Sequence, residues 1–178
     1  AVGDGRPPRG IGAGVEAREK NSYPVVLGNL LGEKYETKNF GVSGATLLKK
    51  GDNPWWKLQQ FTQATEYAPN IVIIKLGTND TKPQNARFKD EFAGDLAAMV
   101  DHFAALPSKP QIFLCIPVPV YEAKWGINEP ELQAFVIPAI KKVAADKKLQ
   151  TIDIYTALSN KPEMVPDKIH PNAAGAAI

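Results

Sequence analysis

Short, almost continuous apolar runs alternate along this chain with longer segments of helical periodicity. The clearest runs are residues 71–76, 111–117 and 151–155, and weaker candidates are residues 35–40 and the stub Ala1-Val2. Strands that are apolar on both sides fit a parallel sheet whose two faces are covered by helices. The alternation therefore predicts an α/β protein with a five-stranded parallel sheet.

Helical patterns fill the segments between these runs. They span residues 22–31, 55–67, 88–106 and 129–147. Ser22 is the predicted N-cap of the first helix, with Pro24 in its first turn and Gly32 directly after its end. Pro138 lacks a backbone N–H, so we expect it to kink the fourth helix.

Composition and length exclude several classes of protein. A length of 178 residues predicts one domain, residues 1–178, trimmed at both ends. The net charge of +2 is too small to favour nucleic acid or an acidic membrane as a partner. No apolar run approaches the roughly 18 residues of a membrane span. The first residues are no signal peptide, which leaves a periplasmic or secreted location open if a signal has been removed.

Scarce residue types limit the possible chemistry. Cys115 is the single cysteine, which excludes an internal disulfide and a multi-cysteine zinc site. It lies inside an apolar run, so we expect an inert core thiol. There are two histidines, His102 and His170, and four serines, so histidine-assisted serine chemistry has few possible participants.

Glycines and small polar residues follow the predicted strands. In open parallel sheets, ligands bind outside the carboxyl ends of the strands. The segments at these ends are Gly3-Asp4-Gly5, Gly41-Val42-Ser43-Gly44-Ala45, Gly77-Thr78-Asn79-Asp80, Pro117-Val118-Pro119 and residues 166–171. This edge of the sheet is therefore where we expect the chemistry.

Asp167 and His170 are the first candidate pair at this edge. Three positions apart, they can face each other across a tight turn, where the carboxylate would orient the imidazole and leave its second nitrogen free as a base. The alternative is a solvated surface turn. His102 lies in the middle of a helical pattern, so we expect an exposed or half-packed helix residue there.

Two residues could stabilise a negatively charged oxygen. The side-chain amide of Asn79 could donate to a developing oxyanion, although Asn79 and Asp80 could instead cap and turn the chain. Gly44 would let a substrate approach its backbone N–H closely, or it is an ordinary turn glycine. Ser43 lacks the final glycine of the G-x-S-x-G nucleophile elbow, which favours a turn hydroxyl over a nucleophile.

Four blocks, in this order, resemble the GDSL, or SGNH, hydrolase family over nearly the whole chain. They are Gly3-Asp4, Asn39-Phe40-Gly41-Val42-Ser43-Gly44, Gly77-Thr78-Asn79-Asp80 and Asp167-Lys168-Ile169-His170-Pro171. The resemblance implies a flavodoxin-like three-layer α/β/α sandwich and a serine esterase. It also implies roles in catalysis: His170 as the base and Asp167 as its orienter. Gly44 and Asn79 would form the oxyanion hole.

A narrower resemblance bears on the substrate. Residues 19–24 and 125–128 are similar to bacterial sialate or carbohydrate O-acetylesterases. This similarity implies small acyl esters as substrates, acetylated sugars among them, and requires neither a metal nor another cofactor. We expect Trp125 and Asp80 to contact the substrate, with Trp125 acting as a sugar-stacking or lid residue.

Position 5 departs from the family pattern. The family's first block is Gly-Asp-Ser, whose serine is the nucleophile, whereas this chain has Gly5, which has no hydroxyl. The backbone N–H of Gly5 could still serve the oxyanion hole, although Pro7 and Pro8 constrain the following loop. Three explanations stay open: a natural relative without the nucleophile, an engineered change, and a reading-frame error.

Two functions therefore compete. The first is an esterase that removes acetyl or other small acyl groups, with activity in doubt because losing a triad nucleophile costs on the order of 10⁶ in turnover. The second is a binding module that keeps the ester or sugar pocket without turnover. The oligomeric state stays open.

Overall fold

The computed structural model describes residues 22–178. Its strands are β1 (Ile71–Ile74), β2 (Gln111–Ile116) and β3 (Gln150–Asp153). Its helices are α2 (Tyr23–Leu31), α3 (Gln59–Glu66), α4 (Pro83–Ala86), α5 (Phe92–Ala104), α6 (Glu129–Glu131), α7 (Ile137–Asp146), α8 (Ile154–Leu158) and α9 (Ala173–Ala176). Short helical turns are η1 (Trp55–Lys57), η2 (Asn79–Thr81), η3 (Lys89–Glu91), η4 (Leu132–Val136) and η5 (Pro162–Met164).

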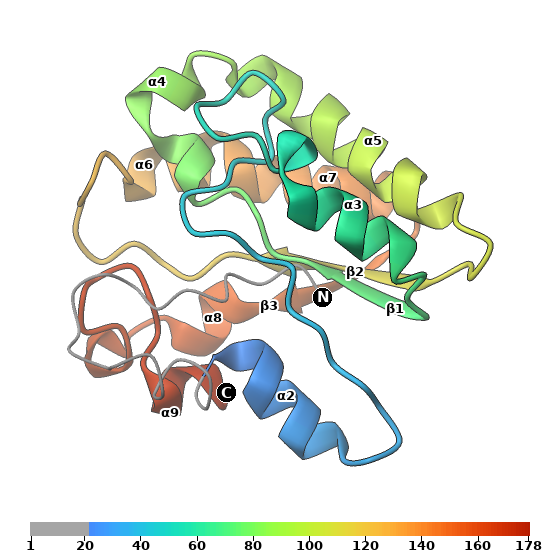
Figure 1. The fold of residues 1–178 in the computed structure, drawn as a ribbon. Helices are drawn as coiled ribbons and strands as arrows, with labels where there is room; N and C mark the ends of the chain where they lie inside the picture. Colours follow the sequence, from blue (N-terminus) through green and yellow to red (C-terminus); the bar gives the residue numbers. More distant parts are fainter. Residues whose placement is uncertain (1–21) are drawn as a thin grey trace.

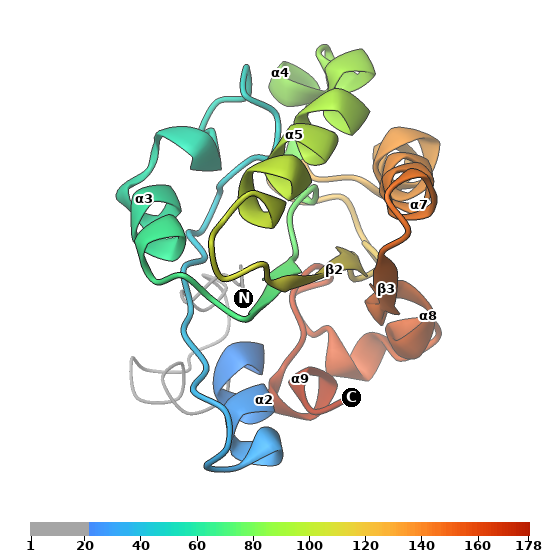
Figure 2. The same cartoon turned by 90° about the vertical axis from the view of Figure 1, so that its right-hand side faces the viewer.

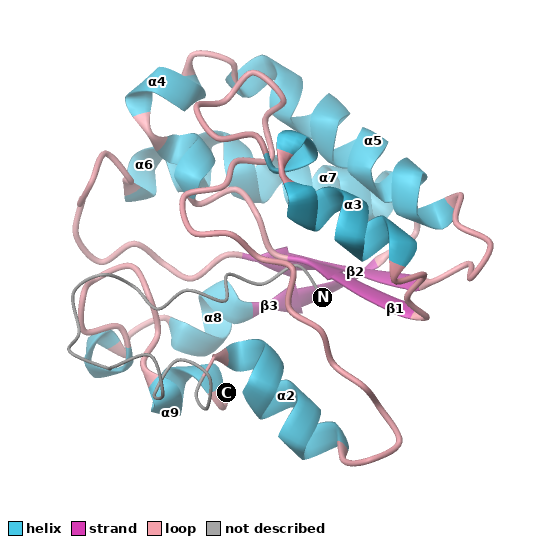
Figure 3. Cartoon of the chain, viewed as in Figure 1, coloured by secondary structure: helices cyan, strands magenta, loops and turns pink. Residues whose placement is uncertain are grey.

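The three strands form one parallel sheet in the order β1–β2–β3 (Figure 3). Ile71 is in register with Gln111, and Phe113 with Gln150. The central strand β2 is therefore hydrogen-bonded on both sides. Because all three strands are parallel, their carboxyl ends share one edge, where the segments after β1 and β2 begin.

Helices cover both faces of this sheet. Helices α3, α5 and α7 lie on one face, and α2, α8 and α9 lie on the other (Figures 1 and 2). The larger core lies beneath the first group and includes the fully buried side chains of Trp55, Phe92, Met99, Phe103 and Leu114. The predicted α/β class, with a parallel sheet covered on both faces, is confirmed.

The expected count of five strands is not confirmed: residues 22–178 contain three of the four strands expected there. Residues 35–40 form an irregular segment instead of a strand. Glu36 and Lys38 pair with each other at 2.9 Å, and Tyr35 is half exposed, so this segment lacks the continuous apolar character of a buried strand. The expected strand end at Ala1-Val2 lies outside the described residues.

The third strand ends earlier than its sequence predicts. The carboxylate of Asp153 accepts the backbone N–H of Thr156 at 2.9 Å and thereby caps α8. An aspartate at this position favours the start of a helix. Ile154 and Tyr155, which were expected in the strand, therefore belong to α8.

The predicted helix ends and the kink have counterparts in the structure. Helix α2 begins after Ser22 and ends at Gly32, whose φ is +70°. The fourth helical segment is interrupted by the π-helical turn η4, which ends two residues before Pro138. A widened turn accommodates a residue that cannot donate a backbone hydrogen bond. Across residues 22–178, no helix has the length and apolarity needed to cross a membrane.

Candidate active site

A small pocket of about 70 Å³ brings the predicted segments together. Its lining comes from the glycine-containing loop at residues 41–45, the end of β1, the loop after β2 and the segment before α9. Asn79 and His170 both face this pocket, although 91 positions separate them in the sequence. The carboxyl edge of the sheet therefore holds a site built from residues far apart in the chain.

Asp167 and His170 make the contact that their spacing predicts. Nδ1 of His170 lies 2.9 Å from one carboxylate oxygen of Asp167. The other oxygen accepts the backbone N–H groups of His170 and Ile169 at 2.7 and 3.0 Å. Because an ionised carboxylate can only accept a hydrogen bond, Nδ1 carries the hydrogen, and Nε2 is left free to act as a base.

The surroundings of Asp167 keep it ionised. Its side chain is buried, and burial alone would raise the pKa. The backbone N–H groups of His170 and Ile169, together with the His170 side chain, outweigh burial and hold the pKa below its usual value. The carboxylate therefore stays charged and can stabilise an imidazolium on His170.

Asn79, the candidate oxyanion donor, also lines this pocket. One N–H of its side-chain amide donates to the carbonyl of Ala45 at 3.2 Å. Within residues 22–178 no partner is found for the second N–H, and a side-chain amide has two donors. Asn79 is therefore fixed in place with one donor left for a substrate oxygen.

Asp80, which the sequence predicts to contact the substrate, does not line this pocket. Its side chain is fully buried and accepts the backbone N–H groups of Leu47 and Leu48 at 3.1 and 2.8 Å. Burial raises its pKa to about 6, although these two hydrogen bonds act in the opposite direction. Asp80 therefore fastens the loop at residues 45–48 beside Asn79 instead of reaching a ligand.

Asn85 and Asp52 extend this fastening, and sequence reasoning missed both. The side-chain amide of Asn85 donates to the backbone carbonyl of Asn79 and to the carboxylate of Asp52, each at 2.9 Å. Its amide oxygen accepts the backbone N–H of Asp52 at 2.8 Å. Asn85 is fully buried, so these bonds hold the candidate oxyanion donor rigidly. No local pattern marked Asn85.

Two glycines shape the backbone around the pocket. Gly44 has a φ of +80°, and only the Asn53 side chain, 3.9 Å away, would meet a Cβ placed there. Its neighbours Val42 and Ala45 line the pocket, whereas Gly44 and Ser43 do not. Gly77 has a φ of +119°, and a Cβ there would lie 2.6 Å from Val136. The chain leaves β1 through a position that only glycine fits.

Gly5, the expected nucleophile position and third oxyanion donor, lies outside the described residues. The prediction that it contributes a backbone N–H is therefore carried by the sequence alone. Of the four serines, Ser159 uses its hydroxyl to donate to the backbone carbonyl of Tyr155 at 2.8 Å, which is a local contact within the chain.

Trp125 lies beside His170. Its ring centroid is 6.1 Å from that of His170, and its side chain is half exposed. Trp125 and Gly126 have φ values of +54° and +82° at the tip of a hairpin in which Lys124 and Ile127 exchange both backbone hydrogen bonds. Positive φ at both tip residues is typical of a type I′ turn, where Asn or Gly is usual. A bulky aromatic residue there is strained, which often marks a functional position.

The loop that carries this hairpin, residues 117–128, is tied to both halves of the site. The backbone N–H of Tyr121 donates to the carbonyl of Lys168 at 2.9 Å, on the His170 side. The side-chain amide of Asn128 donates to the carbonyl of Thr81 at 3.0 Å, on the Asn79 side. Asn128 also caps α6, and the pattern Asn-x-x-Glu before an apolar segment could have revealed it.

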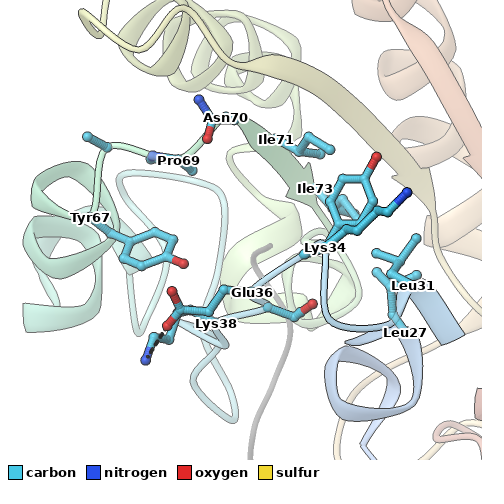
Figure 4. A pocket seen from close by; sticks show the side chains of 13 residues that line it. Leu27, Leu31, Lys34, Glu36, Lys38, Tyr67, Pro69, Asn70, Ile71 and Ile73 are labelled. Carbon is cyan, nitrogen blue, oxygen red and sulfur yellow. Dashed lines mark ion pairs between the residues drawn. The ribbon is translucent and has the colours of Figure 1, made fainter. Parts of the chain in front are cut away.

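Pocket size does not identify the site. A pocket of about 470 Å³ lies beside the amino-terminal end of β1, between α2, residues 34–38 and Tyr67 (Figure 4). Its wall mixes apolar side chains such as Leu27 and Ile71 with the Glu36–Lys38 ion pair. None of the catalytic candidates reaches it, so the smaller pocket at the carboxyl edge is the candidate site.

The remaining candidates take structural positions. His102 is half-buried on α5, where Nε2 lies 2.8 Å from the Thr65 hydroxyl and burial lowers the pKa of the ring. Cys115 is buried, and burial raises the pKa of its thiol to about 11. Within residues 22–178 no cluster of three or more metal-ligating side chains occurs.

Comparison with known sequences gives a consistent set of matches. A sequence model of the GDSL-like Lipase/Acylhydrolase family matches residues 10–178. An acetylxylan esterase of Xylanibacter ruminicola is 38% identical over 183 residues, covering 93% of this chain and 38% of that protein. A multidomain esterase of Ruminococcus flavefaciens is 26% identical over 153 residues, covering 80% of this chain and 19% of that protein. The chain thus spans less than half of the length of either relative.

Solved structures share the fold. A carbohydrate acetylesterase from Sinorhizobium meliloti matches with a TM-score of 0.70 at 20% identity, covering 89% of this chain and 80% of that chain. An acetyl xylan esterase matches with a TM-score of 0.70 at 19% identity, covering 89% of this chain and 86% of that chain. At these identities the likeness establishes the α/β fold alone.

Proposed function

The chain belongs to the GDSL-like lipase/acylhydrolase family, and from this membership we propose that its site acts on small acyl esters, chiefly acetyl esters of carbohydrates. The 38% identity to an acetylxylan esterase supports the acetyl group and the saccharide as the parts to be recognised. The exposed ring of Trp125 beside His170 supports a sugar as the alcohol part of the ester.

The observation that carries the proposal is the 2.9 Å contact between Nδ1 of His170 and Asp167, in the pocket that Asn79 also lines. Nε2 of His170 takes a proton from the nucleophile as it attacks the ester carbonyl. The carbonyl oxygen gains negative charge and accepts the free N–H of Asn79. The family resemblance adds the backbone N–H of Gly44 as a second donor, although only its neighbours Val42 and Ala45 line the pocket. The imidazolium then returns its proton to the departing sugar oxygen.

The residue at position 5 determines which group can attack the ester. A serine at position 5 would attack directly, whereas glycine leaves water as the attacking group, with Nε2 of His170 accepting one of its protons. Hydroxide then adds to the acyl carbon, and the sugar leaves as its alcohol. A site without its nucleophile can retain roughly 10³–10⁴ over the uncatalysed reaction, so we expect slow turnover.

The absence of a hydroxyl at position 5 also favours a second candidate function. A site that keeps Asn79 and Trp125 but lacks the nucleophile would bind an acetylated sugar and release it unchanged. The hydrogen bond from the buried side chain of Asn85 to the backbone of Asn79 holds the pocket in shape whether or not the site catalyses a reaction.

Hydrolysis of 4-nitrophenyl acetate and of acetylated xylo-oligosaccharides tests the proposal. We expect the parent chain to be slow and a Gly5→Ser variant with a shortened loop at residues 6–10 to gain several orders of magnitude. Adding His170→Ala to that variant should remove the gain. No gain in the serine variant would contradict the assigned mechanism. Calorimetric binding of the oligosaccharides without their hydrolysis would favour the binding module.

A further inference from the structure

The hairpin tip at Lys124 and Trp125 carries a cation that the ester chemistry does not use. The ammonium group of Lys124 lies 4.9 Å from the centroid of the Trp125 ring, and both side chains are exposed. Within the described residues Lys124 forms no ion pair with a carboxylate. A positive charge is thus held at the rim of the site, next to an aromatic face that a sugar can stack on.

A second lysine approaches the same tip. A Cβ on Gly126 would lie 3.5 Å from Cγ of Lys82, so the stem of Lys82 packs beside the hairpin. The carboxylate of Asp52 accepts hydrogen bonds from the side-chain amides of Gln84 and Asn85. These bonds and the positive charge of Lys82 lower the pKa of Asp52 against the effect of burial. Lys82 thus already has a carboxylate near it, and Lys124 is the stronger candidate for binding an anion.

Carboxylates near this rim are already engaged, with one exception. Asp167 is bound to His170, and Asp80 is buried under the loop at residues 45–48. Glu129 accepts the backbone N–H of Val120 at 2.7 Å. Glu122 is exposed two positions before Lys124 and is the one negative charge of residues 117–128 without such a bond in the described structure. The rim therefore has a positive charge that a ligand carboxylate can satisfy.

We propose that Lys124 and Trp125 form an accessory subsite that selects acetylated saccharides bearing a carboxylate. The sugar next to the acetylated one stacks on Trp125, and its carboxylate pairs with Lys124. This inference rests on the proposed function, because it names the saccharide that the same site prefers. The carboxylate can belong to a uronic acid branch on a xylan chain or to an acidic sugar of the sialic acid type.

Calorimetric titration of the parent chain tests this subsite with three ligands. They are a neutral acetylated xylo-oligosaccharide, the same oligosaccharide with a glucuronic acid branch, and an O-acetylated sialic acid. We expect one or both acidic ligands to bind about two- to five-fold more tightly than the neutral one, as an exposed ion pair allows. High salt should reduce this preference. The two acidic ligands identify which source of the carboxylate fits.

Three variants assign the preference to its residues. Lys124→Gln should abolish the preference for acidic over neutral ligands. Lys141→Gln removes an exposed lysine of α7 and should leave that preference unchanged. Trp125→Ala should weaken the binding of the neutral and the branched oligosaccharide to the same extent. An equal preference in Lys124→Gln and the parent would overturn the subsite. Equal binding of neutral and acidic ligands by the parent would also overturn it without touching the proposed function, whereas failure to bind any ligand would contradict the proposed function itself.

Discussion

Asp80 and Asp167 are both buried carboxylates, and their different partners give them different tasks. Asp167 accepts three N–H groups, one from an imidazole, and its pKa lies below the usual value. Asp80 accepts two backbone N–H groups, and burial raises its pKa to about 6. The first carboxylate is suited to supporting a charge on His170, and the second is suited to holding a loop.

Replacing Asp167 tests this difference. Since the folded-state pKa of Asp167 is lowered, its stabilisation is present above the ordinary carboxyl pKa of 3.8 and is lost as the pH falls through the folded value. We expect Asp167→Asn to lower the free energy of unfolding by about 1–3 kcal/mol at pH 7, and the difference from the parent to shrink below about pH 4. Urea unfolding of both proteins between pH 3 and pH 7 measures this difference in the free energy of unfolding.

Asp146→Asn is the matched control, since Asp146 is an exposed partner of Lys142. Its effect on the free energy of unfolding should be small at every pH. A loss in Asp167→Asn that stays constant down to pH 3 would contradict the assigned pKa shift.

Residue-level prediction succeeded where the partners are close in the sequence. The contact between Asp167 and His170 follows from a spacing of three, because a tight turn brings such residues together. The burial of Asp80 depends on backbone N–H groups 32 and 33 positions away, at Leu48 and Leu47. No local pattern contains that information, so the sequence alone could not reveal the burial of Asp80.

At the scale of elements, the exit from β1 depends on Gly77. A methyl group at this position would lie 2.6 Å from Cγ1 of Val136, in a backbone conformation that side chains rarely adopt. We expect Gly77→Ala to lower the free energy of unfolding by about 1–3 kcal/mol through overpacking. Val136→Ala in the same chain should restore part of the loss, because it removes the methyl group that clashes. Urea unfolding of the single and double variants measures both effects.

Gly94→Ala provides the matched control on α5. A Cβ at Gly94 meets no atom within 4 Å, so alanine should leave stability unchanged or raise it by up to about 1 kcal/mol. A Gly77→Ala variant as stable as the parent would show that the end of β1 can move away from η4.

Strands were predicted correctly where the apolar run in the sequence was uninterrupted. The runs at residues 71–76 and 111–117 are apolar throughout, and both contain strands. Residues 35–40 carry two charges, and no strand forms there. At Asp153 a capping side chain outweighs the β-branched residues that follow it. Local side-chain hydrogen bonds, which apolar periodicity ignores, therefore set these boundaries.

At the scale of the whole molecule, Cys115 reports on the integrity of the sheet. It is the single cysteine of the chain, lies in the central strand β2 and is 2% exposed. Since the thiolate is the reactive form and burial raises the thiol pKa to about 11, we expect a thiol reagent to label native protein no faster than the sheet opens. Labelling followed by absorbance in increasing urea should accelerate toward the unfolding transition.

A chain with Cys115→Ala and Ala105→Cys is the control, because Ala105 is exposed after α5. That cysteine should be labelled at once under native conditions. Equally fast labelling of the parent would mean that β2 is accessible without unfolding.

The hairpin at residues 124–127 has a consequence for how this molecule can diversify. Its loop is held through Tyr121 and Asn128, which lie outside the two tip residues Trp125 and Gly126. Variation at the tip therefore leaves these anchors intact. Directed evolution confined to positions 124 and 125 should therefore change ligand preference at little cost to folding, since the contacts that hold the loop lie elsewhere.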